Sequence, residues 1–130
     1  MKTVAGFALV GALVMGASSV LAQAPATDPL AAGQRVFLAC KTCHSLEAGG
    51  KDGAGPNLNG LFGKKAGTVS KGFNYSPALQ AYGVVWTDAT LDAYLMNPTK
   101  AVPGTKMVTR APADPARRAA LIAYLKASTR

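Results

Sequence analysis

The strongest constraint on this 130-residue chain is a pair of closely spaced cysteines followed directly by its only histidine. Cys40, Cys43 and His44 form a C-x-x-C-H motif. On one helical turn, positions i and i+3 face the same way, so each thiol can bond one vinyl group of the same porphyrin. The histidine at i+4 can then turn its imidazole toward the iron. The motif is typical of covalent c-type haem attachment, and it predicts one haem c bound through Cys40 and Cys43.

A redox dithiol or a small disulfide is the alternative interpretation of the two cysteines. A redox C-x-x-C expects a preceding strand inside a βαβ unit, and the sequence shows neither pattern. Two cysteines and one histidine also exclude a disulfide-rich scaffold and a site with several histidines. No Asp or Glu pair stands out as acid/base machinery. Haem attachment is therefore the favoured interpretation.

Residues 1–22 have the pattern of a secretory signal peptide. Lys2 precedes a long apolar run that ends in small residues. We predict cleavage after Ala22, a linker over residues 23–27 and a folded domain over residues 28–130, which places the mature chain in the periplasm. The alternative is an uncleaved anchor, because about 18 apolar residues can span a bilayer. Glycines and serines dilute the run, so we expect no stable membrane span after cleavage.

Proline and glycine divide the predicted domain into short helices. An acid or hydroxyl residue followed by proline marks a helix start, and glycine or a later proline marks an end. No convincing strand pair is present. The predicted helices run from Pro29 into the cysteine motif, from Ser76 and Pro77 to Gly83, from Thr87 or Asp88 to just before Pro98, and from Asp114 and Pro115 to about Ala127.

Long loops join these helices. Residues 45–75 have no sustained period and contain eight glycines, and residues 99–113 form a second predicted loop. A loop as long as the first normally has something to wrap, and so short a chain has little apolar area of its own. The sequence therefore predicts an all-α domain of four to five short helices and long loops, wrapped around one covalently bound haem.

The sixth position of the iron decides what such a haem does. With no second histidine, methionine is the leading candidate, and the predicted domain contains Met96 and Met107. Met96 lies about 140° from Leu91 around its predicted helix, so it is interpreted as a surface side chain. Met107 follows Pro103 and Gly104 in a loop that can approach a flat ligand. Plain packing is the alternative role for Met107.

The chain resembles the class I c-type cytochromes, in particular the bacterial periplasmic electron carriers of the mitochondrial cytochrome c type. The likeness runs in order through nearly the whole predicted domain. The matching segments are Gly33 and Phe37, residues 40–44, residues 55–63, residues 72–75, Trp86, Tyr94, residues 97–98, residues 103–107 and residues 121–126. The resemblance implies a helical fold around one haem, with His44 and Met107 as the metal ligands.

The resemblance also implies contacts around these ligands. The Pro56 carbonyl should accept a hydrogen bond from the His44 ring, which fixes the ring and raises its basicity. Tyr94 should approach the Met107 sulfur. Gly33 should let the first and last helices cross closely.

Three more side chains are assigned to the haem propionates by the same likeness. Tyr75, Trp86 and Thr105 should each bond a propionate. On composition alone they are ordinary core or loop residues, so these cofactor-binding roles depend on the resemblance.

Three positions depart from the mitochondrial pattern. Lys64 stands where those proteins place an arginine near a propionate, and lysine lacks the bidentate fork. Leu79 replaces an internal asparagine, so a smaller buried water network is expected. Thr109 replaces a phenylalanine beside the exposed haem edge, which affects partner fit.

Histidine and methionine together would close both axial positions and leave no place for a substrate. The expected function is therefore one-electron transfer rather than enzyme catalysis, by a soluble carrier that shuttles between a bc-one-type donor and a terminal oxidase or photosynthetic reaction centre. A methionine ligand favours Fe(II) and raises the reduction potential. The alternative is a five-coordinate haem enzyme or gas-binding protein, which applies if Met107 does not bind the iron.

The charge of the chain predicts its partners. The formal net charge is +8, and it becomes +7 once Lys2 leaves with residues 1–22. The resemblance implies that several lysines ring the exposed haem edge, where they should attract acidic docking faces of membrane redox complexes. The alternative is a basic surface that is merely solvated. We expect a monomer and no nucleic-acid partner. The lysines that flank the haem-binding segments are Lys41, Lys51, Lys64, Lys65, Lys71, Lys100 and Lys106.

Overall fold

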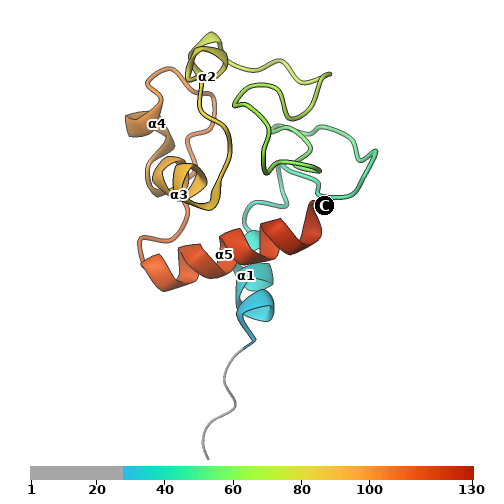
Figure 1. The fold of residues 1–130 in the computed structure, drawn as a ribbon, viewed down its shortest axis with the longest axis vertical. Helices are drawn as coiled ribbons and strands as arrows, with labels where there is room; N and C mark the ends of the chain where they lie inside the picture. Colours follow the sequence, from blue (N-terminus) through green and yellow to red (C-terminus); the bar gives the residue numbers. More distant parts are fainter. Residues whose placement is uncertain (1–27) are drawn as a thin grey trace, which may run out of the picture.

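The computed structural model describes residues 28–130, which form five helices joined by long loops (Figure 1). The helices are α1 (Pro29–Phe37), α2 (Pro77–Ala81), α3 (Asp88–Met96), α4 (Pro98–Ala101) and α5 (Pro115–Ser128). This part of the chain has no strand, only an isolated bridge between Lys65 and Val85. The predicted all-α class is confirmed, whereas the predicted signal peptide and linker, residues 1–27, lie outside the described residues.

Side-chain caps begin the helices where the sequence predicts them. The Asp28 carboxylate accepts a hydrogen bond from the Leu30 amide at 3.0 Å, and Asp114 accepts from the Ala116 amide at 2.9 Å. Proline follows each acid at the first helical position, where its missing amide costs nothing. Hydroxyl caps begin α2 and α3 in the same way. No helix within residues 28–130 is both long and apolar enough to cross a bilayer.

Helix α1 ends at Phe37, earlier than predicted, and the cysteine motif lies in the turns that follow. The Phe37 carbonyl accepts from the amides of Cys40 and Lys41, at 2.8 and 3.0 Å. The Cys40 carbonyl accepts from the amides of Cys43 and His44, both at 3.0 Å. Because pairs of amides converge on single carbonyls, the regular helical ladder stops. Apolar periodicity continues through this point, so it does not reveal the break.

The predicted loop over residues 99–113 is also interrupted, because it begins within α4. The Asn97 side chain accepts from the Lys100 amide at 3.2 Å and caps this short helix. The sequence pattern predicts Pro98 only as a stop after α3. Pro98 is also the first residue of α4, where proline is well tolerated.

Helices α1 and α5 cross at Gly33, as predicted (Figure 1). A Cβ atom at Gly33 would collide with the Ala120 carbonyl and would lie 2.6 Å from the Cβ of Tyr124. The Phe37 and Tyr124 rings pack beside the crossing with their centroids 5.7 Å apart. Leu121 on α5 is only 1% exposed. The crossing therefore fixes the C-terminal helix against the segment that leads into the cysteine motif.

Side-chain hydrogen bonds hold the long glycine-rich loop in one conformation. The Asp52 carboxylate accepts from the Asn57 amide at 2.7 Å and from the Ser70 hydroxyl at 2.9 Å. The buried Asn57 side chain donates to the Ser45 hydroxyl at 2.7 Å and to the Glu47 carbonyl at 3.0 Å. These bonds join distant parts of the loop and give the interior a defined wall.

Candidate functional site

A cavity of about 270 Å³ lies between the glycine-rich loop, α3, α5 and the segment that contains residues 105–109. Most of its wall is apolar, so bound water would find few hydrogen-bond partners there. An apolar space of this kind suits a large, flat, hydrophobic group. The apolar lining includes Phe37, Leu58, Leu61, Val69, Leu91, Leu95, Leu121 and Leu125.

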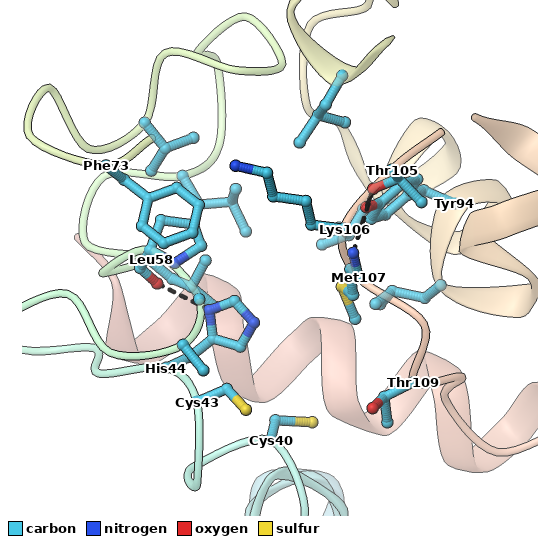
Figure 2. A pocket seen from close by; sticks show the side chains of 18 of the residues that line it. Cys40, Cys43, His44, Leu58, Phe73, Tyr94, Thr105, Lys106, Met107 and Thr109 are labelled. Carbon is cyan, nitrogen blue, oxygen red and sulfur yellow. Dashed lines mark hydrogen bonds between the residues drawn. The ribbon is translucent and has the colours of Figure 1, made fainter. Parts of the chain in front are cut away.

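The turn after α1 brings the motif to this cavity. Cys40, Cys43 and His44 all line the cavity, and Figure 2 shows the three side chains grouped on one wall. The two thiols are partly buried and are not joined to each other. Burial raises the pKa of the Cys40 thiol, and the neighbouring Cys43 raises it further. Both thiols are thus available for covalent attachment to one group.

The His44 imidazole is fixed by its surroundings. Its Nδ1 lies 2.7 Å from the Pro56 carbonyl oxygen. Because a carbonyl can only accept, Nδ1 carries the proton and Nε2 keeps a free lone pair. Burial lowers the pKa of His44, with the Pro56 hydrogen bond acting in the opposite direction. The neutral ring therefore presents a metal ligand at Nε2.

Gly55 allows this arrangement, although the sequence analysis assigned it no role. A Cβ atom at Gly55 would collide with the His44 ring and would lie 2.7 Å from Nε2. The imidazole therefore packs directly on the backbone beside Pro56. In the sequence, Gly55 stands immediately before Pro56, the residue expected to contact the His44 ring. Only the packing in the structure shows that this position must be glycine.

Met107 lies on the wall opposite His44 (Figure 2). The preceding Gly104 has φ of 92°, a left-handed conformation that favours glycine and turns the chain back toward the cavity. The Thr105 amide donates to the Val102 carbonyl at 3.0 Å and closes this turn. Met96 is 53% exposed and is not part of the cavity lining, in agreement with its interpretation as a surface side chain.

The Tyr94 hydroxyl reaches the Met107 segment through Thr105. Tyr94 and Thr105 share a hydrogen bond of 2.8 Å between their side-chain oxygens. The same threonine oxygen accepts from the Met107 amide at 3.4 Å. Burial raises the pKa of Tyr94, although the Thr105 hydrogen bond partly opposes this shift. The tyrosine thus supports the backbone that carries the thioether.

Tyr75 and Trp86 also line the cavity. The Tyr75 oxygen accepts from the Ser70 amide at 2.8 Å, which leaves the hydroxyl proton free to donate. Burial raises the pKa of Tyr75, so this proton is retained at neutral pH. The Trp86 ring packs against Tyr94 with centroids 5.2 Å apart. All the residues that the sequence assigns to one site therefore meet around one cavity.

The three positions that differ from the mitochondrial pattern lie in different surroundings, and one of the lysines expected near the haem edge lines the cavity. Lys64 donates to the Val69 carbonyl at 3.3 Å, whereas Leu79 and Thr109 line the cavity. The exposed Lys106 also lines the cavity, and its Nζ donates to the Asn74 carbonyl at 2.8 Å. Figure 2 shows this side chain reaching across from the Met107 wall toward the wall that carries Phe73.

These features fit a haem attached through two thioethers. The cavity is apolar, its two thiols lie beside the imidazole, and the only thioether in its lining faces the imidazole from the opposite wall. Imidazole nitrogen and methionine sulfur are both ligands of haem iron. The donor set and the apolar walls suit an iron porphyrin and would serve a hydrated cation poorly.

Comparisons with known proteins agree with this site. The sequence profile of the family described as "Cytochrome c" matches residues 30–129. The chain is 49% identical over 109 residues to "Cytochrome c" of Guizotia abyssinica, covering 83% of this chain and 96% of the relative. It is 46% identical over 118 residues to "Cytochrome c2" of Rhodomicrobium vannielii, covering 91% and 90%. The solved structure of cytochrome cH from Methylobacterium extorquens superposes with a TM-score of 0.70 at 45% identity, covering 75% of this chain and 97% of that one.

Proposed function

The chain belongs to the cytochrome c family, and on that premise we propose that it is a one-electron carrier whose haem iron is bound by His44 and Met107. Cys40 and Cys43 attach the haem c that this family carries. The observation that supports the ligand pair is the placement of an imidazole and a thioether on opposite walls of one apolar cavity. When bound, the haem supplies an iron that alternates between Fe(II) and Fe(III).

The protein sets the properties of that iron through its own side chains. The Pro56 carbonyl orients the His44 ring and raises its basicity as a ligand. The Met107 thioether is soft and favours Fe(II), which raises the reduction potential. The apolar walls exclude water and disfavour the additional charge of Fe(III). If His44 and Met107 both bind the iron, no position would be left for a substrate, and this fits electron transfer and not enzyme catalysis.

The cavity also offers donors for the two haem propionates. We assign this role to Tyr75, Trp86 and Thr105. The Tyr75 hydroxyl already accepts from the Ser70 amide, so its own proton can go to a carboxylate. The Trp86 indole is only a donor, and its residue lines the cavity. These contacts would neutralise little charge, but they would fix the orientation of the haem.

The proposed cellular role follows from the start of the chain and from its charge. Export to the periplasm would remove residues 1–22 and leave residues 23–27 as a linker before the domain at 28–130. The partners would be membrane redox complexes with acidic docking faces, a bc-one-type donor and a terminal oxidase or photosynthetic reaction centre as acceptor. The protein would act as a monomer and without nucleic acid.

The absorption spectrum of the reduced protein with and without carbon monoxide tests the coordination. A closed His44/Met107 iron should give a spectrum that carbon monoxide leaves nearly unchanged, and acid-acetone extraction should leave the colour on the polypeptide. Rapid carbon monoxide binding by the wild-type protein would instead support the five-coordinate enzyme or gas-binding alternative. Colour that extracts into the solvent would contradict covalent attachment.

Charge reversal of Lys41 should slow electron transfer to an acidic partner, mainly at low salt. Electrostatic steering raises association rates by about 10- to 10³-fold, and it weakens as the Debye length falls from ~30 Å at 0.01 M salt to ~8 Å at 0.15 M. Lys41→Glu should therefore reduce the bimolecular rate several-fold at low ionic strength and leave the potential nearly unchanged. Stopped-flow electron transfer against salt concentration measures this effect.

Two further variants help to interpret the effect of Lys41→Glu on the bimolecular rate. Arg130→Glu changes the net charge equally. Lys41 stands between Cys40 and Thr42, which both line the cavity, whereas neither Arg130 nor its neighbour Thr129 does, so Arg130→Glu should slow transfer much less. Lys106→Glu should act like Lys41→Glu but also breaks the hydrogen bond to Asn74. Equal effects of Lys41→Glu and Arg130→Glu, or rates that do not depend on salt, would mean that these lysines are merely solvated and do not guide docking.

A further inference from the structure

Arg118 is the only charged side chain buried within residues 28–130, with an exposure of 5%. It lies on α5 and uses every nitrogen of its guanidinium. Its Nε donates to Asp92 Oδ1 at 2.5 Å and its Nη2 to Asp92 Oδ2 at 3.4 Å, which joins α5 to α3. Its Nη1 donates to the carbonyls of Pro112 and Ala113, at 3.0 and 3.1 Å. The planar fork of arginine suits this geometry, and lysine cannot reproduce it.

The two carbonyls belong to the segment that connects Met107 to α5. Residues 108–110 of this segment are exposed. The first backbone anchor after them is the Ala111 amide, which donates to the Leu95 carbonyl on α3 at 3.0 Å. Arg118 then holds the next two residues from the other side. The segment is thus fastened between α3 and α5 immediately after the exposed stretch.

We propose that Arg118 is a positioning residue for Met107. Through its bonds to Asp92 and to the carbonyls of residues 112–113, it holds this segment beside α3 and supports the contact of Ala111 with Leu95. The proposal rests on the proposed ligation of iron by Met107. Before Met107, the chain is tied by the Thr105 contact with Tyr94 and by the Lys106 contact with Asn74. After Met107, the chain is held by the Ala111 bond to Leu95 and by the Arg118 bonds to the carbonyls of residues 112–113. Loss of the Arg118 contacts would lengthen the stretch after Met107 that has no backbone anchor. The thioether could then leave the cavity while the helices stay folded.

A second ion pair between the same helices provides a matched control. Lys126 Nζ on α5 lies 2.9 Å from Asp88 Oδ1 on α3, and both side chains are more than half exposed. This pair bridges α3 and α5 and makes no hydrogen bond to residues 108–113. If Arg118 only stabilised the contact between α3 and α5, variants of the two pairs should have the same kind of effect and differ only in how much stability they lose.

The test follows two signals of the Fe(III) holoprotein in urea: the weak far-red absorption band of an iron–methionine bond, and the far-ultraviolet circular dichroism of the helices. In Arg118→Lys and Asp92→Asn the band should disappear at a clearly lower urea concentration than the helical signal. In Asp88→Asn the two transitions should keep the separation seen in the wild type. Asp92→Asn retains Arg118 and its carbonyl contacts, so it remains informative if Arg118→Lys folds poorly.

Hydrogen exchange of the Ala111 amide gives a second, residue-specific measurement in the absence of urea. We expect exchange about tenfold faster or more in Arg118→Lys and Asp92→Asn, because a local opening costs less free energy there, and no such change in Asp88→Asn. Transitions that shift together in the Arg118 and Asp92 variants, or an unchanged Ala111 rate, would overturn the proposal. A wild-type protein without the far-red band would instead overturn Met107 ligation, and the Ala111 rates would still decide whether Arg118 pins the segment.

Discussion

Replacement of Met107 by alanine should abolish the far-red band of the Fe(III) protein, lower its reduction potential and open the iron to carbon monoxide. Met107 contributes the only thioether in the cavity lining, on the wall opposite His44. Axial ligands spread haem potentials over about 0.8 V, so loss of a soft ligand should lower the potential by on the order of 0.1 V or more. Spectroelectrochemical titration with a carbon monoxide difference spectrum measures all three effects.

Met96→Ala is the matched control for this experiment. It removes the same type of side chain from α3, where Met96 is 53% exposed and is not part of the cavity lining. The band, the potential and the resistance to carbon monoxide should all persist. If Met96→Ala eliminates the band and Met107→Ala preserves it, the ligand assignment is wrong.

The features that sequence predicts well here are those encoded by neighbouring residues. The caps at Asp28 and Asp114 are local, because an acid followed by proline satisfies amides within the same turn. The meeting of Cys40, Cys43 and His44 is local too, and the motif keeps its geometry although α1 ends before it. A short-range pattern therefore defined the chemistry even where it misplaced the end of a helix.

The features that sequence could not provide depend on contacts between distant segments. In the sequence Arg118 resembles an ordinary surface residue of α5. Its burial is explained by its approach to Asp92, 26 positions away, together with its bonds to the Pro112 and Ala113 carbonyls. Tyr94 was expected beside the Met107 sulfur, and its hydroxyl bonds Thr105. Both residue types have several possible partners, and only tertiary packing selects one of them.

The double variant Cys40→Ser, Cys43→Ser should lose covalent haem and be largely unfolded. Without the haem the cavity of about 270 Å³ must collapse, fill with water or stay empty. At about 24 cal/mol per Å³ an empty cavity of this size costs roughly 6 kcal/mol, which is comparable with the ~5–15 kcal/mol stability of a whole domain. Intact-protein mass spectrometry should detect no added haem, and circular dichroism should show that most helical signal is lost.

The single variant Cys40→Ser and the neutral variant Thr42→Ala separate attachment from folding. Cys40→Ser keeps one thioether bond beside His44, so the haem should stay bound and the helices should persist with lower thermal stability. The Thr42 hydroxyl donates to the Ala39 carbonyl at 3.2 Å and to the Cys43 sulfur at 3.7 Å. Thr42→Ala removes these bonds but keeps both cysteines, so it should keep the covalent haem and the helical signal. A colourless double variant that still melts cooperatively would mean that the apolar walls close on themselves, and the long loops would then be stabilised by bonds such as those of Asp52 and Asn57 and not by the haem.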